Sequence, residues 1–110
     1  MEKMGIVRGL SLMLALWTCT GAGSARAGAE EGKKIFVGKN CITCHSLGEE
    51  KGKMAQLGGP LDGIGSKQEA AWLKSYLLDP KSQIADAKMP KQSLTATELE
   101  DLVAYLLSLK

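Results

Sequence analysis

Apolar residues recur at helical spacing in two stretches of the chain, each preceded by a helix-start signal. Ser66 is followed three residues later by Glu69, the pattern of a capping box, and the helix that it opens is predicted to stop at Pro80. Thr95 and Glu98 repeat the pattern and open a terminal helix. The two apolar faces consist of Ala70, Leu73 and Leu77, with Trp72 and Tyr76 beside them, and of Leu99, Leu102, Val103, Leu106 and Leu109. Each helix therefore has one face to bury.

A third helix and two irregular stretches complete the pattern. Residues 30–39 place Ile35, Phe36 and Lys39 at helical spacing behind an acidic first turn. Residues 46–65 contain six glycines and show no sustained period, and the stretch from Pro80 to Leu94 is also irregular. A loop as long as residues 46–65 is uncommon in a compact domain, so we expect it to wrap around a bound group. Because no stretch alternates polar and apolar residues, the pattern predicts an all-α fold.

The chain begins with the layout of a secretory signal peptide. The basic residues Lys3 and Arg8 precede a short apolar run over residues 10–17, and a segment of small residues follows. A cleavage site of small residues ends at Ala27, and cleavage after Ala29 fits nearly as well. This layout predicts export from the cytoplasm.

Two other interpretations of the same segment are weaker. The apolar run has about half of the roughly 20 residues that a membrane-spanning helix needs. A lipoprotein centred on Cys19 would place the bulky Thr18 where a small residue is usual. We therefore predict that residues 1–27 are a cleaved signal and that residues 28–110 form one periplasmic domain without a stable membrane anchor.

The net charge looks different once this segment is set apart. The whole chain has 14 basic and 12 acidic residues, a formal charge of +2. Residues 1–27 contain three of the basic residues and one of the acidic ones, so they carry the entire +2. The remaining 83 residues have 11 lysines, 11 acidic residues and no arginine. Since nucleic-acid binding favours a basic face and arginine contacts, this balance argues against a nucleic-acid partner.

A domain of this size has a marginal apolar core and usually needs disulfides, a metal or another covalent link to be stable. The segment from Cys41 to His45 reads Cys-Ile-Thr-Cys-His, the signature of c-type haem attachment. At this spacing two thiols form thioethers to one edge of the porphyrin, and the histidine falls beneath the iron. We therefore predict one haem c, bound covalently through Cys41 and Cys44, with His45 as an iron ligand.

Three other interpretations of the two cysteines are weaker. A Cys-x-x-Cys redox pair would directly follow a strand, whereas the flanking sequence here predicts a helix and a glycine-rich loop. A zinc site would need four ligands, and residues 28–110 have two cysteines and one histidine. A disulfide between cysteines three residues apart closes too short a loop to stabilise much. Haem attachment accounts for the pattern best.

The second axial ligand of the iron is expected on the opposite face of the haem. Without a second histidine, the candidates are Met54 and Met89, unless a lysine or water ligates. Met89 lies 44 residues after His45, far enough for the chain to pass around the haem. Met54 lies only nine residues after it and is interpreted as a gap-filler in the core. We predict that His45 and Met89 are the metal ligands.

The order of these motifs resembles that of a small bacterial class I cytochrome c over nearly the whole of residues 28–110. The matching features are Gly32-x-x-x-Phe36, Cys41-x-x-Cys44-His45, Gly59-Pro60, Met89-Pro90 and a terminal helix with Tyr105. The resemblance implies three to five short helices wrapped around one haem. It also implies that the first helix crosses the last, with Gly32 allowing the close approach and Phe36 packing near Tyr105. The Pro60 carbonyl is expected to accept a hydrogen bond from His45.

An iron with both axial positions filled has no site for oxygen, peroxide or substrate, so we expect single-electron transfer and no catalysis. The first function class is a free, monomeric periplasmic carrier of a respiratory chain. The second is an electron-accepting haem subunit of a larger oxidoreductase of sulfur or nitrogen compounds, since residues 72–80 are similar to both kinds of protein. A third is a ligand-binding or peroxidatic haem protein in which Met89 does not coordinate.

The expected partners are other redox proteins, a donor and an acceptor. Five lysines lie near the ligand-bearing segments, and a basic ring at the haem edge would attract acidic partners. An ordinary solvated surface explains them as well, because three acidic residues interleave with them. The lysines are Lys39, Lys51, Lys53, Lys88 and Lys91, and the acidic residues are Glu49, Glu50 and Asp86.

Overall fold

A computed structural model describes residues 24–110 of the chain, so the predictions for residues 1–23 lie outside the described residues. The first helix, α1, spans Ser24–Gly38 and is longer than the sequence pattern indicated. Its beginning precedes Glu30, so Glu30 and Glu31 lie in the middle of the helix and not in its first turn. The alanine-rich sequence before Glu30 has a high helix propensity, which the apolar periodicity does not register.

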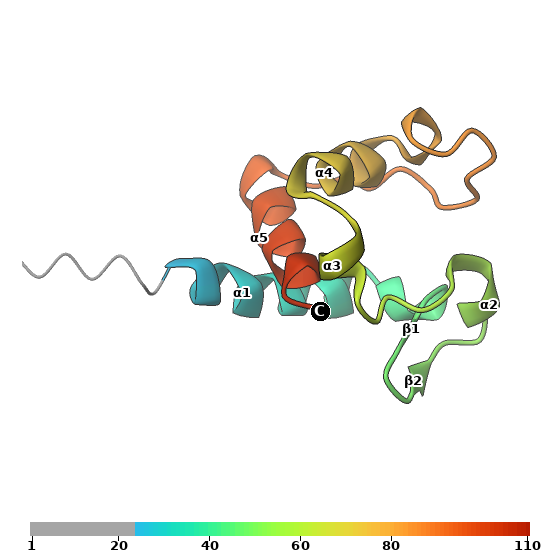
Figure 1. The fold of residues 1–110 in the computed structure, drawn as a ribbon, viewed down its shortest axis with the longest axis horizontal. Coiled ribbons are helices and arrows are strands. Elements are labelled where there is room, and N and C mark those ends of the chain that lie inside the picture. The colour runs from blue at the N-terminus through green and yellow to red at the C-terminus, as the bar shows by residue number, and fades with distance from the viewer. Residues whose placement is uncertain (1–23) are drawn as a thin grey trace, which may run out of the picture.

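The terminal helix α5, Ala96–Leu107, is the centre of the fold. It packs against α1 on one side and against α4, Ala70–Leu78, on the other, and α3, Ile64–Lys67, lies near its end (Figure 1). Gly32 of α1 lies so close to α5 that a Cβ there would meet the Asp101 carbonyl and approach Tyr105 Cβ to 2.7 Å. The predicted crossing of the first and last helices is therefore confirmed.

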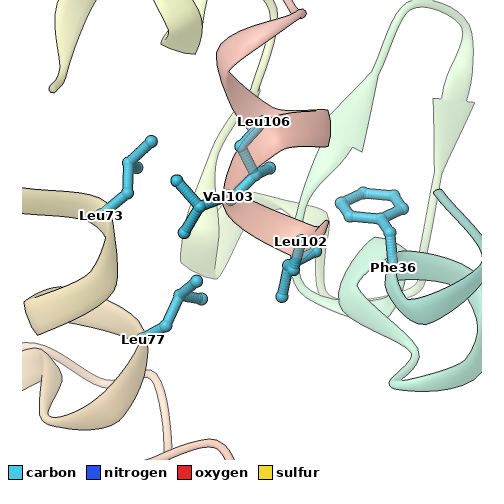
Figure 2. Close-up of a cluster of buried hydrophobic side chains, with 6 residues drawn as sticks. All are labelled: Phe36, Leu73, Leu77, Leu102, Val103 and Leu106. Atoms are coloured by element: carbon cyan, nitrogen blue, oxygen red, sulfur yellow. The ribbon is translucent and has the colours of Figure 1, made fainter. Parts of the chain in front are cut away.

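The core lies where α5 meets α1 and α4. Figure 2 shows its six buried side chains, with those of α5 between Phe36 and the leucines of α4. The rings of Phe36 and Tyr105 are 5.4 Å apart and tilted by 58°, an arrangement that aromatic pairs favour. The six residues are Phe36, Leu73, Leu77, Leu102, Val103 and Leu106. The helical faces predicted from the sequence are thus the faces that the structure buries.

The two predicted capping boxes have different outcomes. At α5, Glu98 N donates to Thr95 Oγ1 over 3.1 Å and Thr95 N donates to Glu98 Oε1 over 2.9 Å, so this box is confirmed. At α4 the prediction is wrong: Ser66 lies inside α3, and Glu69 precedes α4 without a side-chain cap. The reason is tertiary, because α3 is a separate turn that Gly65 brings against the Leu107 carbonyl of α5.

The glycine-rich stretch after the cysteines is more ordered than its sequence indicated. Strands β1, Ser46–Leu47, and β2, Glu50–Lys51, form a short antiparallel hairpin, and α2, Ala55–Gly58, follows. Two 3-10 helices, η2 at Cys41–Thr43 and η3 at Pro80–Ser82, complete the described elements. The fold is helical as predicted, and the hairpin is the departure from an all-helical chain. None of the helices in the described part has both the length and the apolar character needed to cross a membrane.

Candidate functional site

The two cysteines lie at the turn that follows α1. Asn40 adopts a left-handed conformation with φ of 58°, which ends the helical path of α1 and leads into η2. Cys41 begins η2 and Cys44 follows it, and both are half-buried free thiols. Burial raises the pKa of the Cys41 thiol, which keeps that sulfur protonated at neutral pH. Two unpaired thiols on one turn fit covalent attachment of one ligand.

His45 is held by the loop that precedes α3. Its Nδ1 lies 3.1 Å from the carbonyl oxygen of Gly59, and because a carbonyl only accepts, Nδ1 carries the proton and Nε2 is left for a metal. This corrects the expectation that the Pro60 carbonyl accepts the bond. Ser46 N donates to Gly59 O over 3.2 Å and Leu61 N to Ser46 O over 2.8 Å, a register that turns the Gly59 carbonyl to the ring. Pro60 instead lines the adjacent cavity.

Two adjoining cavities, of about 200 and 380 Å³, open beside these residues. The first has predominantly apolar walls and reaches the core residues of α4 and α5. The second extends along the segment around Cys44 to the loop after η3. Both are lined by Cys41, His45, Gly58, Tyr76, Ile84 and Met89. Together they have the size and apolar character of a site for a cofactor.

Met89 reaches these cavities from a part of the chain remote from His45. It lies in the loop between η3 and α5, which Gln92 N ties to the Leu77 carbonyl over 3.0 Å. Met54, by contrast, is 47% exposed and lines neither cavity. The interpretation of Met54 as a core gap-filler is therefore wrong, because its backbone N is fixed to the Thr43 carbonyl at the surface. Of the two methionines, the structure brings Met89 to the site.

Several residues that line the site were not singled out for it from the sequence. Trp72 and Tyr76 stack with their rings 4.9 Å apart and nearly parallel, and Trp72 lines the first cavity. Their spacing of four residues predicts that the two rings touch each other, but it does not predict that they line a cavity. Ile84, a large apolar side chain that is 40% exposed, lines both cavities.

The residues present fit a haem. Two free thiols and an imidazole lie on one segment, a thioether comes from a distant loop, and the space they share is apolar. Cys41 and Cys44 would hold the porphyrin edge, and His45 and Met89 are the candidate iron ligands. Within residues 24–110, no group of three or more His, Cys, Asp and Glu side chains could hold a metal ion by itself.

The five lysines are distributed unevenly around this site. Lys39 and Lys88 line the second cavity, and Lys91 lines a neighbouring one. Lys39 Nζ also donates to the Ser93 carbonyl over 3.0 Å. Lys51 and Lys53 lie in and after β2 and line neither cavity of the site. The structure therefore places two of the five lysines on the second cavity and a third beside it, with the acidic Asp86 among them.

A comparison with protein families gives one result that bears on this site. A family model described as Cytochrome c matches residues 29–110. No curated protein and no solved structure matches the chain. The matched region contains every residue assigned to the site above.

Proposed function

Because the chain belongs to the cytochrome c family, we propose that it is a periplasmic single-electron carrier with one haem c bound through Cys41 and Cys44. Family membership supports haem-based electron transfer directly. The observation that carries the fuller proposal is that Cys41 and His45, on one segment, line the same two cavities as Met89, which comes from a distant loop. When bound, the haem supplies an iron that accepts and releases one electron.

The residues around the cavities would set the properties of the site. Donation from His45 Nδ1 to the Gly59 carbonyl makes the imidazole a more basic ligand and fixes its ring orientation. As an iron ligand, the soft thioether of Met89 would favour the reduced state and raise the reduction potential. The apolar walls from α4 and α5 exclude water, which acts in the same direction. If His45 and Met89 both held the iron, no coordination site would remain for a substrate, and electron exchange would be favoured over catalysis.

Substitution of Met89 tests the axial assignment. We expect Met89→Ala to lose the absorption features of methionine ligation, to lower the reduction potential and to let the reduced protein bind carbon monoxide. Met54→Ala is the matched control and should leave all three unchanged, because that side chain lies away from the cavities. A Met89→Ala protein with the spectrum and potential of the native one would refute the assignment. Carbon monoxide binding by the native protein at neutral pH would favour the ligand-binding or peroxidatic alternative.

Location and partners belong to the same proposal. We propose that residues 1–27 are removed on export, so the periplasmic protein should begin at Gly28 or Glu30, which its intact mass would show. The proposed partners are redox proteins that dock near Lys39, Lys88 and Lys91. Weaker electron transfer at high salt would support this, and rates with an acidic partner that do not depend on ionic strength would exclude it.

Native purification separates the free carrier from the subunit of a sulfur- or nitrogen-compound oxidoreductase. A carrier elutes alone as a monomer, whereas a subunit co-elutes with its catalytic partner in a fixed ratio. We propose the carrier, and co-elution with a catalytic partner in a fixed ratio would replace it with the subunit.

A further inference from the structure

Gly58 lies directly against the imidazole ring of His45. A Cβ on Gly58 would lie 2.5 Å from His45 Cε1 and 2.6 Å from Nδ1, and would also meet the Cys44 carbonyl oxygen. Real Cβ atoms essentially never come this close, so a side chain here would displace the ring or the loop. Gly58 is not among the glycines with positive φ, unlike Gly59 with φ of 73°. Glycine is therefore required at position 58 by contact and not by backbone conformation.

Hydrogen bonds hold this loop to the residues on both sides of His45. Gly58 N donates to the Cys44 carbonyl over 2.7 Å, and Ser46 N donates to the Gly59 carbonyl over 3.2 Å. The same Gly59 oxygen accepts from His45 Nδ1 over 3.1 Å. The backbone of the loop is thus fixed on either side of the ring, and the ring has little freedom to move relative to the Gly59 oxygen.

We propose that Gly58 is a positioning residue for His45: its lack of a side chain lets the loop close onto the ring and keep Nδ1 bonded to the Gly59 carbonyl. This rests on the proposed function, in which His45 Nε2 binds the iron. A Cβ at position 58 would move the ring and weaken the bond from Nδ1. A ligand histidine with a weaker bond is less basic and stabilises oxidised iron less, so the reduction potential rises.

The test compares Gly58→Ala with Gly65→Ala in the full, haem-loaded protein. A Cβ on Gly65 would meet the Leu107 carbonyl and lie 3.0 Å from Leu107 Cα, so it creates a similar backbone clash at a site that does not contact His45. We expect Gly58→Ala to shift the NMR signals of the His45 ring and to raise the reduction potential above that of the native protein, because a weaker bond makes His45 a less basic ligand. Gly65→Ala should lower stability but change neither readout.

A second measurement needs no variant. In the reduced native protein, a nuclear Overhauser effect should connect the Gly58 Hα protons with the His45 ring, because the two are in contact. Its absence, or a Gly58→Ala protein with the potential and ring signals of Gly65→Ala, would overturn the positioning role alone. A native protein without haem at Cys41 and Cys44, or without reversible one-electron reduction, would refute the proposed function instead.

Discussion

Gly32 shows how a single missing side chain sets the distance between two helices. A Cβ at this position would collide with the Asp101 carbonyl, so we expect Gly32→Ala to force α1 and α5 apart and to lower the free energy of unfolding by about 1–3 kcal/mol. Chemical denaturation followed by circular dichroism measures this. Gly38→Ala in the last turn of α1 is the control, because a Cβ there meets nothing within 4 Å, and it should cost little or nothing. Equal stability of the two variants would contradict the packing argument.

At the residue scale, the sequence predicts the groups that carry chemistry better than those that orient them. Cys41, Cys44 and His45 follow from a local spacing with a chemical reason behind it. The acceptor for His45 does not, because the choice between Gly59 and Pro60 depends on how the later loop pairs with Ser46. The contact of Gly58 with the ring has the same origin. Register between segments more than ten residues apart is a tertiary property that neither propensity nor periodicity encodes.

At the scale of elements, the first turn of α5 gives a pH-dependent contribution to stability. The pKa of Glu98 is lowered from its usual value of 4.5, first by the hydrogen bond from Thr95 N, so the carboxylate is favoured in the folded state. A lowered folded pKa adds stability above the unfolded value and loses it as pH falls through the folded one. We therefore expect the stability difference between the native protein and Glu98→Gln to be constant near neutral pH and to shrink below about pH 4.5. Denaturation at a series of pH values checks this, and a difference that grows on acidification would contradict it.

The elements also show where local signals fail. The same capping pattern is correct at Thr95 and wrong at Ser66, although each has a glutamate three residues later. The difference is that Ser66 already belongs to another helix. It lies in α3, which ends at Lys67 and packs on α5, so it cannot cap α4. The hairpin β1–β2 is missed for a related reason, since two residues in each strand are too few to show an alternating pattern. Long amphipathic helices can be predicted from this sequence, whereas short elements fixed by their neighbours cannot.

At the scale of the whole molecule, α5 contributes both to the packing of the helices and to the wall of the cofactor site. Its contact with α1 joins the ends of the described chain through Gly32, Phe36 and Tyr105. Its contact with α4 forms one wall of the first cavity, with the cysteine segment and the Met89 loop around the remainder. The buried side chains are therefore shared between the core and the cofactor site. Stability and cofactor binding should depend on each other in such an arrangement.

This dependence predicts that the chain does not fold without haem. Without haem, the apolar walls of the first cavity, a space of about 200 Å³, would be left open to water. The total stability of a domain is about 5–15 kcal/mol, and a chain this small lies near the lower limit. The double variant Cys41→Ser/Cys44→Ser cannot form the thioethers, so we expect it to lose most of its helical circular dichroism and its cooperative thermal transition. If it retained native helix content and unfolded cooperatively without haem, the six-residue core would be sufficient by itself, and the cavities would not be the place where the cofactor completes the fold.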